Sequence, residues 1–96
     1  MTKRREYLDE LDEYAKTAEP ICGWARLYFP SDQAEINVAL CESHVMDWLA
    51  ARGWFNVAFE DGEYTVTRDG EARAWHGTTR LLALINAVAA TKEVQP

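Results

Sequence analysis

Few residues of the kinds that carry out chemistry occur in this chain of 96 residues. It has two cysteines, Cys22 and Cys41, and two histidines, His44 and His76. A histidine next to a cysteine can activate it as a nucleophile, and Cys41 and His44 lie three positions apart in a predicted helix. However, Cys41 falls on the apolar stripe of that helix and His44 on its polar side, so we interpret both as structural. We predict that the protein is not an enzyme.

The same four residues could supply the ligands of a zinc site. Zinc ligands usually come in closely spaced pairs, such as C-x-x-C or H-x-x-x-H, and the sequence contains neither spacing. The five glycines are scattered and form no phosphate-binding loop. We therefore predict no metal and no other cofactor.

Acidic side chains gather in two places, around the first predicted turn between strands and on the N-terminal segment. The N-terminal cluster consists of Glu6, Asp9, Glu10 and Glu13. Catalytic carboxylates usually lie in an apolar pocket that raises one of their pKa values, whereas these positions are predicted to be exposed. We interpret the cluster as a solvated face that is a candidate contact surface for a partner.

Four tryptophans are many for a chain of this length. Trp54 is predicted to lie at the end of a helix, on the small-residue face of a sheet, where it could be exposed. An exposed tryptophan near an arginine such as Arg73 is a typical anchor for a partner or a nucleobase. Trp54 and Arg73 therefore join the acidic cluster as candidate partner-binding residues, with partial burial of Trp54 as the alternative.

The net charge of −6 disfavours direct binding of nucleic acid, which requires a basic surface. It favours a basic protein partner, although 16 acidic against 10 basic side chains are too small an excess to imitate a duplex. The sequence has no apolar run of the roughly 18 residues that a membrane span needs. Neither a signal peptide nor a disulfide framework is indicated, so we expect a cytoplasmic protein with free thiols.

Hydrophobic periodicity predicts a first helix over residues 1–19. Glu19-Pro20 is expected to end it, because the residue before a proline avoids the helical region. Residues 21–30 are rich in apolar and aromatic side chains and are predicted to be an extended segment.

A second helix is predicted over residues 33–52, where apolar side chains recur every three or four positions. Ser31 or Asp32 is expected to cap its start, and Gly53 to end it. A last helix is predicted over residues 78–91, capped by Thr78 or Thr79. Its buried stripe is expected to be Leu81, Leu84, Ile85 and Val88.

Two Asp-Gly pairs, Asp61-Gly62 and Asp69-Gly70, predict tight turns between three strands over residues 54–76. Loops of two residues would pair Val57 with Val66, Phe59 with Tyr64, Tyr64 with Trp75 and Val66 with Arg73. The predicted core face holds Phe55, Val57, Phe59, Tyr64, Val66 and Trp75. The fold class is therefore α+β in one domain over residues 1–96, a three-stranded antiparallel meander packed with three helices in the order α-α-β-β-β-α.

Residues 29–92 contain segments that resemble small bacteriophage proteins of the phage ABA sandwich domain group. The resemblance is carried by Phe29-Pro-Ser-Asp32 before a helix, by Leu49-Ala-Ala-Arg-Gly-Trp54, by the strand Tyr64-Thr-Val66, and by Thr78 before an amphipathic helix. It implies a phage or prophage origin, and no catalytic residues, because the group has none established. Small acidic phage proteins of this kind are often anti-defence factors, including anti-CRISPR proteins.

Our leading hypothesis is a phage-encoded protein that binds and blocks a host antiviral defence protein in the host cytoplasm. One alternative is a protein that sequesters a small molecule or a signalling nucleotide, which would need a preformed pocket. Another alternative is an accessory protein of virion assembly or structure. We expect no membrane partner, and the sequence leaves a homodimer open.

Overall fold

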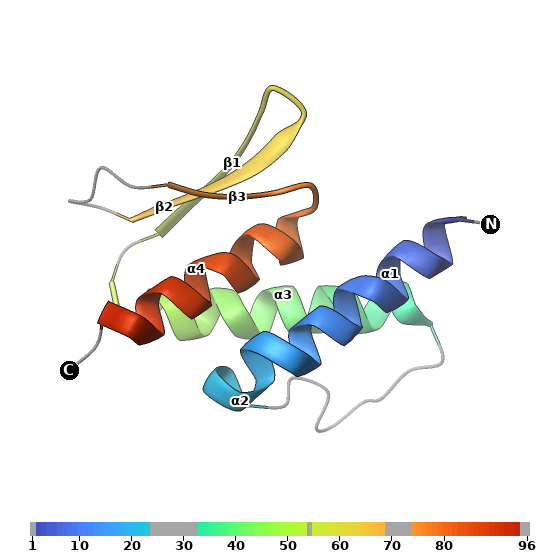
Figure 1. Ribbon diagram of the computed structural model, residues 1–96, viewed down its shortest axis with the longest axis horizontal. Coiled ribbons are helices and arrows are strands. Elements are labelled where there is room, and N and C mark those ends of the chain that lie inside the picture. Colours follow the sequence, from blue (N-terminus) through green and yellow to red (C-terminus); the bar gives the residue numbers. More distant parts are fainter. Residues whose placement is uncertain (1, 24–32, 54, 69–73, 95–96) are drawn as a thin grey trace.

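The computed structural model describes residues 2–23, 33–53, 55–68 and 74–94. Within these ranges the fold is α+β, with all helices on one side of a three-stranded sheet (Figure 1). The helix α4 (Arg80–Val94) contacts β2 and β3, and the helices α1 and α3 pack against it. The predicted class and element order are confirmed. Trp54, Arg73, the caps Ser31 and Asp32, and residues 24–30 of the predicted extended segment lie outside the described residues.

The first helix is longer than predicted and passes through the proline. It runs as α1 (Thr2–Glu13), a π-helical turn η1 (Tyr14–Ala18) and α2 (Glu19–Cys22). In the wide turn, the backbone N–H of Glu19 donates to the carbonyl of Tyr14, five residues earlier. Pro20 follows at the start of α2, where its missing N–H is tolerated. The prediction that Glu19-Pro20 ends the helix was therefore wrong.

Two side chains bind the last carbonyl groups of this bent helix. The Tyr14 hydroxyl donates a hydrogen bond to the carbonyl of Gly23, a residue with φ of 94°. His44 Nε2 donates to the carbonyl of Cys22 at 2.7 Å. Carbonyls at a helix C-terminus lack partners within the helix, so both bonds satisfy such groups, and the bond from His44 also attaches α2 to α3.

The second predicted helix is observed as α3 (Ala34–Ala50), two residues shorter at its C-terminus than expected. Its apolar stripe is confirmed, because Val38, Cys41, Val45 and Leu49 are all buried. Two arginines bind backbone carbonyls at and just after the end of this helix. Arg52 Nη1 donates to the carbonyl of Trp48 at 3.0 Å, and Arg68 Nη2 donates to the carbonyl of Arg52 at 2.9 Å.

The sheet consists of β1 (Phe55–Glu60), β2 (Glu63–Arg68) and β3 (Ala74–Gly77), paired in that order and antiparallel. The register of the first hairpin is as predicted, with Val57 opposite Val66. Its turn has positive φ at Asp61 (53°) and Gly62 (79°), the pair of values that a type I′ turn requires.

The predicted register of the second hairpin was wrong by two residues. Val66 lies opposite Trp75 instead of Arg73, and Tyr64 lies opposite Gly77. The described pairs run as far as Thr67 opposite Ala74, and the predicted turn at Asp69-Gly70 lies outside the described residues. A shift of two keeps every side chain on its predicted face, because side chains alternate along a strand.

The core lies between the inner face of the sheet and the helices. The stripe predicted for the last helix is confirmed, since Leu81, Leu84, Ile85 and Val88 are buried. They pack with Val66 of the sheet and with Tyr14 and Ala18 of the first helix. Among the described residues, no helix is both long and apolar enough to cross a membrane.

Gly77 is the position where the sheet comes closest to a helix backbone. A Cβ atom at Gly77 would lie 2.4 Å from the backbone nitrogen of Ala83. We predict that Gly77→Ala lowers the free energy of unfolding by about 2 kcal/mol or more, because backbone atoms must move apart. Urea denaturation measures this loss. Gly62→Asn is the control, since asparagine tolerates positive φ and open space surrounds Gly62, and it should change stability far less.

Thr91 is a polar residue that is buried in an apolar environment. It is 2% exposed, and its Oγ1 has no hydrogen-bond partner in the described part of the chain. We predict that Thr91→Val, which keeps the shape and removes the hydroxyl, raises the free energy of unfolding by about 1 kcal/mol. Urea denaturation tests this, and a loss of stability would show that the hydroxyl is satisfied in solution.

Candidate partner-binding groove

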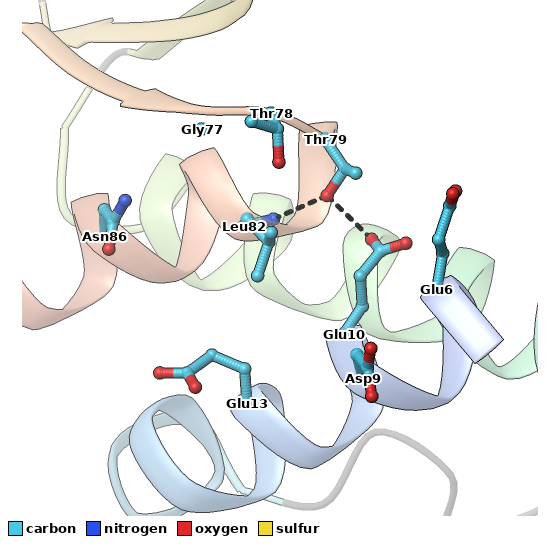
Figure 2. Close-up of a pocket in the computed structure, with 9 residues that line it drawn as sticks. All are labelled: Glu6, Asp9, Glu10, Glu13, Gly77, Thr78, Thr79, Leu82 and Asn86. Atoms are coloured by element: carbon cyan, nitrogen blue, oxygen red, sulfur yellow. Dashed lines mark hydrogen bonds between the residues drawn. The ribbon is translucent and has the colours of Figure 1, made fainter. Parts of the chain in front are cut away.

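A groove of about 680 Å³ runs between α1 and the turn that leads from β3 into α4. Figure 2 shows four carboxylate residues of the first helix on one wall and the start of α4 on the other. The lining residues are Glu6, Asp9, Glu10, Glu13, Gly77, Thr78, Thr79, Leu82 and Asn86. All four acidic residues of the predicted N-terminal cluster therefore line one groove, which we call the acidic groove.

Glu10 differs from its neighbours because it is buried, at 5% exposure. Its Oε1 accepts a hydrogen bond of 2.8 Å from the hydroxyl of Thr79. The Thr79 oxygen in turn accepts from the backbone N–H of Leu82 at 3.2 Å, which makes Thr79 the cap of α4. The prediction that the whole acidic cluster is exposed was thus wrong for Glu10.

The position of Glu10 has an electrostatic reason. The N-terminus of a helix carries a partial positive charge, so a carboxylate next to the first turn of α4 is stabilised there. The cap at Thr79 could be predicted from the sequence. Its partner could not, because Glu10 lies 69 residues earlier in the chain and only the tertiary packing brings the two together.

Glu13 also has partners within its own helix. Its Oε2 accepts a hydrogen bond of 2.8 Å from the Thr17 hydroxyl, and its Oε1 lies 3.9 Å from Lys16 Nζ. Glu6 and Asp9 are exposed. The negative charge that a partner can reach is therefore concentrated at Glu6 and Asp9, around the buried carboxylate of Glu10.

A second cavity of about 400 Å³ lies on the other side of Glu6 and Glu10, and it adds one ion pair to the site. Glu42 Oε1 of α3 lies 3.6 Å from Arg80 Nη1 at the start of α4. Partial burial raises the pKa of Glu42, and the Arg80 guanidinium opposes that rise. Arg80 also lies over the ring of Tyr64, 5.6 Å from its centroid. Local sequence reasoning gave no signal for this pair, which joins two helices.

Cys22, Cys41 and His44 take part in the packing of the described residues, whereas His76 is exposed. Burial raises the pKa of the Cys22 thiol to about 11, with Arg52 lowering it in part, so this thiol is protonated at neutral pH and a poor nucleophile. Cys41 is in the core, and His44 binds the carbonyl of Cys22. His76 lies on the other face of the sheet, with its Nδ1 3.4 Å from Thr65 Oγ1.

In the described ranges, no three His, Cys, Asp or Glu side chains gather in a way that could hold a metal ion. The remaining predicted contact residues, Trp54 and Arg73, cannot be placed relative to the acidic groove, since they lie outside those ranges. Chemically, the groove offers exposed carboxylates as acceptors for cationic groups. Comparison with protein families, curated proteins and solved structures finds no match to this chain.

The bond between Glu10 and Thr79 can be measured as a coupling energy. We predict that Thr79→Ala lowers the free energy of unfolding by about 1 kcal/mol through loss of the cap. In a double-mutant cycle with Glu10→Ala, a coupling of about 1 kcal/mol is expected, because each change removes the partner of the other. Urea denaturation of the four proteins gives this value. The control cycle of Glu6→Ala with Thr79→Ala should show almost no coupling.

Proposed function

We propose that this protein is a non-enzymatic binding protein of phage origin that blocks a host antiviral defence protein, as an anti-CRISPR-type or other anti-defence inhibitor. The acidic groove supports the binding mode, because it is a concave surface with exposed carboxylates at Glu6 and Asp9. The resemblance of residues 29–92 to the phage ABA sandwich domain group supports the phage origin and the host target.

The groove fits a basic protein surface best. Lysine or arginine side chains of a partner would enter between α1 and the start of α4 and meet the carboxylates of Glu6 and Asp9. The net charge of −6 would also speed the encounter with a basic partner, through long-range attraction that salt screens. Defence proteins that bind nucleic acid carry such basic surfaces, and covering one would block its normal ligand.

A protein that sequesters a signalling nucleotide is less well supported by the same site. Carboxylates repel phosphate groups, and the acidic groove presents several of them to any ligand that enters. Sequestration would need a different surface. An accessory role in the virion is favoured by no specific feature of the described residues.

A tagged pull-down from bacterial lysate, with and without nuclease treatment, is the first test. The proposal expects one stoichiometric host protein that is retained after nuclease treatment and whose activity the purified protein inhibits. Capture that depends on nucleic acid, or a bound host protein whose activity is unaffected, would contradict it.

Charge reversal in the groove gives the sharper test, with the captured partner as ligand. We predict that Glu6→Lys with Asp9→Lys weakens binding at least roughly tenfold, because attraction is replaced by like-charge repulsion. Glu10 is unsuitable for this experiment, since a lysine at that buried position would disturb the fold. Calorimetric titration at low and moderate salt measures the affinity, and added salt should weaken the unmodified complex.

The matched control is Asp12→Lys with Asp47→Lys, two exposed acidic residues that do not line the groove. It changes the net charge by the same amount. Equal losses of affinity in both double variants would mean that only the overall charge matters, and would reject the groove as the binding site.

A further inference from the structure

The edge of the sheet that β1 forms has few of the features that protect an edge strand. An edge strand exposes unpaired backbone groups that can bind another strand, and proteins usually prevent this with short strands, charges, prolines or bulges. At one edge lies β3, of which the described part is Ala74–Gly77. The opposite edge, β1, has six residues in an unbroken register with β2. Its sequence Phe55-Asn-Val-Ala-Phe-Glu60 has one charge, at its last residue, and no proline.

The register identifies the backbone groups that face outward from β1. The type I′ turn closes with a hydrogen bond between Glu60 and Glu63, and bonded pairs then alternate along an antiparallel ladder. Ala58 and Asn56 therefore bond to β2, opposite Thr65 and Thr67. The N–H and C=O groups of Val57 and Phe59 point to the open edge, where no described strand pairs with them.

An apolar surface accompanies this open edge. Phe59 is 60% exposed, the largest value among the exposed large hydrophobic residues that the structure describes, and Met46 of α3 is 43% exposed. Both line a shallow groove of about 440 Å³ together with Val57 and Ala58. Exposed apolar side chains beside unpaired strand groups are typical of a surface that another chain covers.

We infer that β1 pairs in antiparallel fashion with β1 of a second copy, so that two sheets join into one across a two-fold axis. In each copy the outward groups belong to Val57 and Phe59, so an antiparallel pair matches these residues with one another. Their side chains then lie on the same face of the joined sheet and cover each other and Met46. The described helices of both copies lie on that face as well (Figure 1).

The charge pattern of β1 permits pairing with a second copy, and the size of the contact determines how strong the dimer is. Antiparallel pairing places the two Glu60 carboxylates at opposite ends of the contact, and the residues between Phe55 and Glu60 are uncharged. One pair of short strands with a few apolar side chains buries less than the roughly 800 Å² per partner of a standard stable interface. The dimer is therefore weak, with a dissociation constant on the order of micromolar.

Salt has opposite effects on the two surfaces of the molecule. Each copy carries a net charge of −6, so the copies repel each other and added salt strengthens the dimer. Added salt weakens the binding of a basic partner in the acidic groove. The dimer does not depend on the proposed function, because the acidic groove and the groove beside β1 share no lining residue.

The first experiment is sedimentation velocity of the full chain over a micromolar to millimolar concentration series, at low and moderate salt. A concentration-dependent dimer that salt strengthens is expected, and Phe59→Lys should abolish it. The control is Leu8→Lys, which adds the same charge at another exposed apolar residue (43%) and should leave the dimer intact. A monomer at every concentration, or an equal effect of both variants, would overturn the inference.

The second experiment reads the strand pairing directly. Amide hydrogen exchange by NMR at low and high protein concentration should slow at Val57 and Phe59 in proportion to the dimer fraction. The amide of Ala58, which faces β2, should not change. A dimer that leaves Val57 and Phe59 unprotected uses another surface, and that result would refute pairing through β1.

Discussion

The buried carboxylate of Glu10 is the constraint on which the arrangement of the first and last helices depends. A carboxylate removed from water is costly unless it is hydrogen-bonded, and the Thr79 hydroxyl provides such a bond at 2.8 Å. The same Thr79 oxygen accepts from the backbone N–H of Leu82 and so caps α4, which places both bonds on the turn after Gly77. The acidic groove is the space beside this contact, so its walls are held by the same bond that stabilises the fold.

Several of the polar and titratable side chains stabilise the fold through hydrogen bonds to backbone carbonyls. His44 and Tyr14 bind carbonyls at and just after the end of α2, and Arg52 and Arg68 bind carbonyls at and just after the end of α3. Each of these side chains belongs to another helical turn, or to another element, than the carbonyl that it binds. Such bonds join elements of a small domain whose hydrophobic core alone provides modest stability.

Local rules predicted the elements well where one rule decided the outcome. The first hairpin followed from its Asp-Gly turn and its alternating side chains, and α3 followed from its apolar stripe. The second hairpin was misread because Asp69-Gly70 has the same signature. Its register brings Gly77 next to the backbone of Ala83, where a Cβ would lie at 2.4 Å, and that demand comes from α4 and not from the turn.

In the candidate site, too, features set by local sequence could be predicted, whereas features set by tertiary packing could not. Spacing by three and four residues predicted that Glu6, Asp9, Glu10 and Glu13 share a helix face, and they do line one groove. Spacing could not show that one of them is buried, because burial is decided by Thr79 in another element. Pro20 is a similar case, where a π-helical turn overrides the preference of the residue before a proline.

The acidic groove and the β1 edge, if both are used, would together allow a mode of binding that neither surface allows alone. Pairing through β1 would leave the acidic groove of each copy open, since the two surfaces share no lining residue. A dimer would thus present two acidic grooves, and a partner with two basic sites would be held more tightly than one groove allows. The two contacts respond in opposite directions to salt, so the dimer contact would offset part of the affinity that the two groove contacts lose when salt is added. A weak dimer is sufficient for this effect. Once one copy is bound to the partner, a second copy that pairs with it has a high local concentration at the second basic site.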